Sequence, residues 1–94
     1  MKKPLLIRPA VFVKLRNLQP SARAECWDAL LRLTENFGQP HLHSGLSIRK
    51  LGRTIFECRG TQDLRILFLN LEDCLEIVLI GNHDDVQREL KKRR

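Results

Sequence analysis

The sequence predicts an α+β fold in which an N-terminal helical hairpin packs on one face of a mainly antiparallel sheet of about four to five strands. Apolar residues recur at helical spacing between Ala10 and Thr34, and from Leu46 to Ile80 they alternate with polar ones. Short breaks that contain Gly or Asp interrupt the alternating stretch at intervals typical of hairpins. The chain has 94 residues, which fits a single domain over residues 1–94.

The first elements are a short strand and a helix. Leu5–Ile7 is apolar and short, which favours an edge strand. Pro9 suits the first turn of a helix, because its missing N–H is not needed there. From Ala10 to Leu18 the apolar residues then follow helical spacing, at Val11, Phe12, Leu15 and Leu18. Gln19-Pro20 ends this helix.

A second helix is predicted to follow Pro20. Ser21 is a candidate N-cap, and Gly38 followed by Pro40 provides a stop signal. The stripe expected to be buried consists of Ala24, Trp27, Leu30, Leu31 and Thr34. Because very little chain joins the two helices, they should form a helical hairpin.

Strands and a short C-terminal helix complete the predicted fold. The strands are expected at Leu46–Leu51, Ile55–Arg59, Leu64–Leu69 and Leu75–Ile80. The breaks between them are short enough for hairpins, so successive strands should pair antiparallel. Asp84–Arg94 opens with acidic residues and closes with KKRR, which suits the dipole of a helix. A frayed tail would have the same composition.

Alternation along the strands sorts the side chains between two faces of the sheet. Phe56 and Cys58 share one face with Ile66 and Phe68, and the helices are expected to cover it. The opposite face is expected to be open, and it carries a set of charged residues: Arg49, Glu57, Arg59 and Arg65.

A predicted strand register aligns these charges. A three-residue loop around Arg53 places Arg49 opposite Glu57. A hairpin loop at Gly60–Gln62 places Glu57 opposite Arg65, and Arg59 opposite Asp63. The result is a row across three strands, Arg49–Glu57–Arg65. Such a row is either an ordinary ladder of cross-strand ion pairs or a surface for an anionic ligand.

Composition limits the class of partner. The formal net charge is +6 and the pI is about 9.8, which favours nucleic acid, an anionic membrane or an acidic protein, or simply a basic protein with no such partner. Cys26, Cys58 and Cys74 have no metal-type spacing and are odd in number, which favours buried free thiols in the cytoplasm over disulfides; a reactive nucleophile is the alternative. No apolar run is long enough to predict a membrane span, and the N-terminus is not a signal peptide.

The residue types favour phosphate chemistry without a metal. There is no Gly-rich phosphate loop and no HExxH motif, and His41 and His43 alone make a poor metal site, so no metal or cofactor is predicted. The chain has one Trp and no Tyr, which argues against stacking on single-stranded bases. Arginines bind phosphate and stabilise its developing charge. His83, directly after the last strand, is either a surface residue or a proton carrier, and these groups suffice for RNA cleavage by the 2′-OH.

From about Leu5 to Val86 the sequence resembles the RelE/ParE superfamily of bacterial toxin–antitoxin toxins. The segments that carry the resemblance are LLIRPAVFVKLRNLQPSAR, GLSIRKL, IFECR, LRILF and IGNH, a pattern of residue classes rather than one rigid motif. The resemblance implies the same hairpin-and-sheet fold and an antitoxin partner. For RelE-like members it also implies cleavage of mRNA on the ribosome.

The resemblance also implies roles for particular residues. Arg65 in LRILF matches the strand arginine that contacts the cleaved phosphate, which Arg49 would help to hold. His83 matches a late position that is Arg or His in different members, here a general acid or base. Glu57 matches a Glu that is an alternative base or a structural partner of the strand arginine. The expected RNA-backbone contacts are Lys50, Arg53 and Arg59.

The sequence departs from the nuclease pattern at one place and leaves other branches open. Gln87 stands where several nucleases of the superfamily carry Tyr or Phe, which puts stacking on an mRNA base in doubt. A HigB-like nuclease is one alternative. A ParE-like protein, which inhibits DNA gyrase without the nuclease residues, is another, and an inactive binding module on the same fold is a third.

Overall fold

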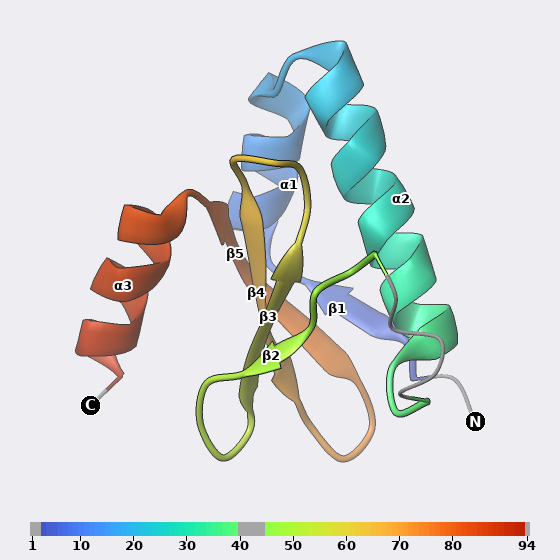
Figure 1. Cartoon of the computed structure of the whole chain (residues 1–94), viewed down its shortest axis with the longest axis vertical. Helices are drawn as coiled ribbons and strands as arrows, with labels where there is room; N and C mark the ends of the chain where they lie inside the picture. The colour runs from blue at the N-terminus through green and yellow to red at the C-terminus, as the bar shows by residue number, and fades with distance from the viewer. Residues whose placement is uncertain (1–2, 40–44, 94) are drawn as a thin grey trace.

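The computed structural model describes residues 3–39 and 45–93 (Figure 1). Within these ranges the chain forms three helices and a five-stranded mixed sheet. In chain order the elements are β1 (Leu5–Ile7), α1 (Pro9–Asn17), α2 (Pro20–Asn36), β2 (Arg49–Lys50), β3 (Ile55–Arg59), β4 (Arg65–Asn70), β5 (Leu75–Gly81) and α3 (His83–Lys92). The predicted α+β class, helical hairpin and short terminal helix are confirmed. His41 and His43 lie outside the described residues.

The strands run in the order β1-β5-β4-β3-β2. β1 is an edge strand, as predicted, and it pairs parallel with β5, with Leu5 opposite Leu75. The other neighbours pair antiparallel. β2 begins later than the predicted Leu46 because Ser47 has a φ of 51°, which interrupts the extended backbone, and it ends before Leu51, whose N–H already donates to the Ile55 carbonyl oxygen in the following turn. None of the helices in the described ranges has the length and apolar character needed to span a bilayer.

The face of the sheet that α1 and α2 cover holds the main core. Cys58, Ile66 and Phe68 are fully buried there, and Phe56 packs against them, so the predicted core face is confirmed. The Phe56 and Phe68 rings stack with centroids 5.7 Å apart, and Phe37 after α2 meets Phe68 edge-on at 5.5 Å. Each fully buried side chain of this size stabilises the fold by about 1.5–3 kcal/mol.

α2 differs from its prediction in its start and in its buried side. It begins at Pro20, with Gln19 as an N-cap that makes no side-chain hydrogen bond, so Ser21 lies inside the first turn because Pro20 fits that position better. The buried residues are Cys26, Ala29, Leu30 and Leu33. Only Leu30 of the predicted stripe is among them, since α2 has apolar residues on two sides and one side alone meets the sheet. Gly38 has a φ of +90°, as expected of a helix stop.

The second face of the sheet is partly covered by α3. Figure 1 shows α3 on one side of the strands and α2 on the other. Val86 of α3 is buried with Leu67 of β4 and Val78 of β5, so the prediction that this face is wholly open is wrong. Gly81 allows the approach, because a Cβ there would lie 2.6 Å from the Cβ of Asp85 in the first turn of α3.

Candidate functional site

The β3–β4 register changes the predicted row of charges. Arg59 lies opposite Arg65, and Glu57 lies opposite Leu67, so the predicted pairs Arg59–Asp63 and Glu57–Arg65 are wrong. The backbone N–H of Gly60 donates to the Leu64 carbonyl oxygen at 2.9 Å, so the turn is centred on Gln62 and not on Thr61, as the predicted Gly60–Gln62 loop required. The partner of each residue moves by two positions, so every side chain keeps its predicted face.

Glu57 is the buried carboxylate of this face. Its side chain is only 9% exposed, and Arg49 Nε lies 3.4 Å from its Oε2 atom. The predicted pairing of Arg49 with Glu57 across β2 and β3 is confirmed. A carboxylate this deeply buried is rare unless it is paired, and the arginine that pairs with it is largely in solvent. Glu57 is therefore a buried acidic group beside the exposed Arg49 guanidinium.

Arg59 and Arg65 form a pair of like charges, called here the Arg59–Arg65 pair. They lie directly opposite each other on β3 and β4. Within residues 3–39 and 45–93 neither forms an ion pair with a carboxylate. Like charges in this position destabilise a sheet by roughly 0.2–1 kcal/mol. An anion bound between the two guanidinium groups would remove that cost.

His83 begins α3 at the end of β5, close to this pair. Arg65 lies opposite Gly81, and His83 follows two residues later as an exposed first residue of the helix. A capping box fixes the turn: the Asn82 side chain accepts from the Asp85 N–H at 2.8 Å, and Asp85 Oδ2 accepts from the Asn82 N–H at 2.9 Å. The position of His83 is therefore set by rigid backbone on both sides.

Lys50 and Arg53 are not brought to the Arg59–Arg65 pair. Lys50 pairs with Phe56, and its Nζ lies 6.0 Å from the centre of that ring. It therefore belongs to the core face, unlike its neighbour Arg49. Arg53 is exposed in the turn before β3, at the opposite end of that strand from Arg59. The basic segment from Arg49 to Arg53 does not form one surface.

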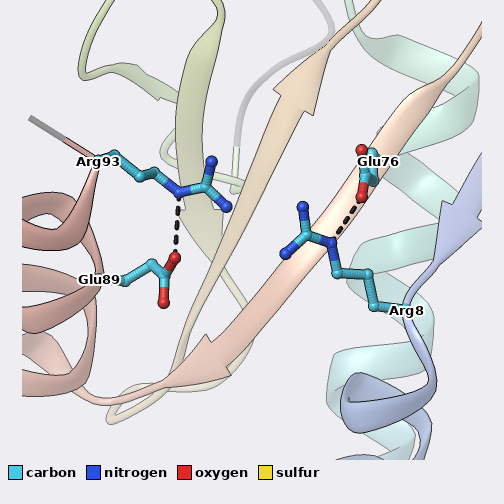
Figure 2. A network of polar contacts seen from close by, with 4 residues as sticks. All are labelled: Arg8, Glu76, Glu89 and Arg93. Atoms are coloured by element: carbon cyan, nitrogen blue, oxygen red, sulfur yellow. Dashed lines mark hydrogen bonds and ion pairs between the residues drawn. The ribbon is translucent and has the colours of Figure 1, made fainter.

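Two arginine–carboxylate pairs near the second face were not predicted (Figure 2). Arg8 Nε, just before α1, lies 2.6 Å from Glu76 Oε2 on β5. Arg93 Nε lies 3.1 Å from Glu89 Oε2 at the end of α3. No sequence pattern predicts the first pair, because its partners are 68 positions apart. The second pair has the ordinary i, i+4 spacing of ion pairs on a helix, so it could have been predicted from the sequence.

The cysteines have no part in this site. Cys26 and Cys58 are buried free thiols, as predicted, whereas Cys74 is only half-buried. Burial, with a smaller contribution from the charge of Glu57, raises the pKa of the Cys58 thiol to about 12. Because the thiolate is the nucleophile, the alternative of a reactive cysteine does not apply to Cys58.

The fold is shared with toxins of known structure. The chain superposes on the archaeal RelE–RelB complex from Pyrococcus horikoshii with a TM-score of 0.69 and 16% sequence identity, covering 87% of this chain and 96% of the other. It also superposes on a copper-bound mutant toxin from Helicobacter pylori with a TM-score of 0.60 and 17% sequence identity. This match covers 92% of the present chain and 99% of the Helicobacter toxin chain. No family model and no curated protein sequence matches the chain. The chain therefore has the fold of the RelE-like toxins.

Proposed function

We propose that the protein is the toxin of a toxin–antitoxin pair and acts as a metal-independent endoribonuclease on mRNA bound to the ribosome. The observation that carries the proposal is the Arg59–Arg65 pair. The two arginines lie opposite each other in the register of β3 and β4, neither forms an ion pair in the described ranges, and Arg65 lies opposite Gly81, two residues before the start of α3. A sheet whose second face served only stability would have no reason to carry this unfavourable arrangement.

The Arg59–Arg65 pair suits a phosphodiester. A guanidinium group binds two phosphate oxygens through parallel N–H donors. In the transition state of cleavage, negative charge grows on the non-bridging oxygens, and fixed donors aimed at them lower the barrier. Arg65 and Arg59 would hold the scissile phosphate in this way. Arg49, being paired with Glu57, would support the carboxylate and reach the same strand of RNA.

The proton transfers require one base and one acid. The base removes the proton of the 2′-OH, the O2′–P bond forms, the P–O5′ bond breaks, and the acid protonates the departing 5′ oxygen. The products are a 2′,3′-cyclic phosphate and a free 5′-hydroxyl. His83 would be the general acid or base, and Glu57 the alternative base. No metal or other cofactor enters this sequence of steps.

The proposed partner is an acidic antitoxin protein. The archaeal relative was crystallised as a complex of RelE with RelB. The net charge of +6 would favour an acidic partner in this chain, both in the rate of association and in specificity. Such a partner would neutralise the toxin by binding the surface that holds the Arg59–Arg65 pair.

The test is induced expression in a bacterium, with primer extension on a reporter mRNA. Wild-type protein should arrest growth and produce new cuts at defined positions within codons. Arg65→Gln and His83→Gln should each reduce cutting on the order of 100-fold or more, while circular dichroism shows an unchanged fold. Arg16→Gln is the matched control, because it removes the same charge from an exposed position on α1.

Other outcomes would point elsewhere. Growth arrest without cuts would indicate a non-enzymatic inhibitor of a protein target, as in the gyrase-type branch. A folded protein that causes neither arrest nor cuts would indicate a binding module on a toxin fold. Equal loss of cutting in Arg16→Gln and Arg65→Gln would show that total charge matters rather than this site.

A further inference from the structure

A pocket opens where the end of α2 lies beside the start of β1 and the β4–β5 turn (Figure 1). Its volume is about 340 Å³. The lining includes one cation, three uncharged polar side chains and two apolar ones: Lys3, Thr34, Gln39, Asn70, Phe37 and Leu75. A concave site in which apolar walls surround a few fixed polar groups is the usual form of a small-molecule site.

Lys3 is held in this pocket by contacts with α2 and with the end of β4. Its Nζ atom donates to Asn70 Oδ1 at 2.7 Å and to the Leu71 carbonyl oxygen at 2.5 Å. Its own carbonyl oxygen accepts from the Thr34 hydroxyl. The Lys3 ammonium is therefore positioned before any ligand arrives, which lowers the entropic cost of binding to it.

The positive charge of Lys3 has no acidic partner. Both acceptors of its ammonium group are neutral oxygens, and within residues 3–39 and 45–93 no carboxylate forms an ion pair with it. An ammonium group has three N–H donors, so one of them remains for a ligand. Because Lys3 is half-buried and a buried charge is costly unless it is paired, the pocket favours an anion in contact with this group.

Two side-chain amides add donors beside this cation. Asn70 accepts from Lys3 through its oxygen, so its NH₂ group is left for a ligand. Gln39 lines the pocket as an exposed residue, and its backbone N–H already donates to the Asn36 carbonyl oxygen at 3.0 Å. The polar side of the pocket is therefore rich in donors, which suits the two oxygens of a carboxylate.

The apolar side of the pocket is formed by Phe37 and Leu75. Leu75 of β5 is fully buried. The Phe37 ring meets the Phe56 and Phe68 rings edge-on, with centroids 5.3 Å and 5.5 Å apart, so it is fixed by the main core. An apolar group placed against these two side chains would be removed from water, which favours binding. The pocket therefore suits a ligand with an anionic end and an apolar body.

We propose that this pocket, here called the Lys3 pocket, binds a small organic monocarboxylate with a compact apolar body. The carboxylate would accept from the Lys3 ammonium and the Asn70 amide, and the body would lie against Phe37 and Leu75. The pocket is lined by one cation, so the second charge of a phosphate ester would have no partner there. A cationic ligand would meet the Lys3 ammonium and be repelled.

The Lys3 pocket is separate from the site proposed for RNA. Arg65 and Asn70 stand at opposite ends of β4, roughly 17 Å apart at the rise of an antiparallel strand. A carboxylate bound beside Asn70 would therefore leave the Arg59–Arg65 pair accessible. The inference does not depend on the proposed nuclease activity, and the two can fail independently.

Amide NMR of the isotope-labelled full chain tests the inference with three probes that share one ring: benzoate, its neutral amide benzamide, and the cation benzylamine. Benzoate should shift the backbone amide signals of Gly38, Gln39 and Asn70 in a saturable titration. Benzamide should bind about tenfold more weakly or worse, because it forms no charge-assisted hydrogen bond with Lys3. Benzylamine should leave these signals unchanged.

Two variants locate the binding. Asn70→Asp keeps the size of the side chain and gives Lys3 the carboxylate that it lacks, so benzoate should bind about tenfold more weakly or worse while a thermal melt shows a folded protein. Lys3→Met removes the cation and should weaken benzoate to the same extent. The matched controls are Asn17→Asp and Lys14→Met, which make the same charge changes at exposed positions on α1 and should leave the titration midpoint unchanged.

Several results would overturn the inference. These are the absence of a saturable response to benzoate, equal affinities for benzoate and benzamide, or a benzoate midpoint unaffected by Asn70→Asp. Shifts centred on Arg59 and Arg65, and lost in Arg65→Gln, would place the carboxylate on the second face of the sheet instead. The titration measures binding to the purified protein, so its result is the same whether or not the chain cuts mRNA.

Discussion

On the face of the sheet under α1 and α2, Phe68, Ile66 and Cys58 are completely buried, whereas on the opposite face of the same strands Arg59 and Arg65 lie side by side. Both faces arise from the same alternation along β3 and β4. The core face has a single apolar cluster that reaches from α1 to β5. The second face has a small cluster under α3 and a group of charges beside it.

The core face provides most of the stability of the fold, whereas the second face carries the residues proposed for function. Burial on the core face contributes several kcal/mol, while the unfavourable Arg59–Arg65 pair costs roughly 0.2–1 kcal/mol. The fold can therefore carry the like-charge pair with little loss of stability. Substitutions on the two faces should accordingly have different consequences, and the experiments below test that division.

The largest effect is expected on the core face. Phe68→Ala should lower the free energy of unfolding by about 3–5 kcal/mol, because the ring is fully buried and contacts both Phe56 and Phe37. Urea denaturation followed by circular dichroism measures the change. Phe12→Ala is the matched control: this ring is 48% exposed, and its loss should cost less than about 1 kcal/mol. Equal costs would contradict the assignment of the core to the sheet side of the hairpin.

A smaller effect is expected where α3 covers the second face. Asn82→Ala removes the side chain that accepts from the Asp85 N–H, and loss of such a cap costs about 1 kcal/mol. Amide hydrogen exchange should become faster in α3 and stay unchanged in α2. Asn17→Ala, at the exposed end of α1, should leave both helices unchanged. Faster exchange throughout the chain would mean that α3 does not open separately.

The sequence pattern predicted correctly which face of the sheet the strand side chains occupy, but it predicted only one of three cross-strand charge pairs, Arg49–Glu57, correctly. Alternation in IFECR and LRILF places Cys58 and Ile66 on the core face whatever the register, since side chains return to the same face at every second position. The partner of Arg65 depends instead on the Gly60–Leu64 turn, in which Thr61 Oγ1 accepts from the Leu64 N–H at 3.1 Å. A local contact of this kind has no periodic signal. The Glu57–Arg65 part of the predicted row was wrong for that reason, whereas its Arg49–Glu57 part is confirmed.

The α2 stripe shows a second limit. Helical spacing identifies apolar residues but not which of two apolar sides will meet the sheet. Cys26 and Leu33 are buried, while Leu31 is the most exposed large apolar residue within residues 3–39 and 45–93. The choice is made by the packing of the whole hairpin against the strands.

Two charge substitutions on the second face should change stability in opposite directions. Arg65→Gln relieves the repulsion with Arg59 and should raise the free energy of unfolding by roughly 0.2–1 kcal/mol. Arg49→Gln leaves the buried Glu57 carboxylate without its partner. This change should lower the free energy of unfolding by about 1 kcal/mol or less, because Arg49 is largely exposed. Thermal melts with and without inorganic phosphate extend the test. Phosphate should stabilise the wild type more than Arg65→Gln, and equal stabilisation would count against an anion site at this pair.

A further effect concerns pH and the core thiol. The pKa of Cys58 is raised from its ordinary value of 9.0 to about 12, chiefly by burial. Above pH 9 the unfolded chain loses this proton while the folded chain keeps it, so the contribution of Cys58 to stability falls as pH rises from about 9 to about 12. Urea midpoints at about pH 8 and about pH 11 should therefore differ more in the wild type than in Cys58→Ala. Cys74→Ala, which removes a half-buried thiol, should behave as the wild type does. If Cys58→Ala shows the same pH dependence of stability as the wild type, burial does not keep the Cys58 thiol protonated in the folded chain.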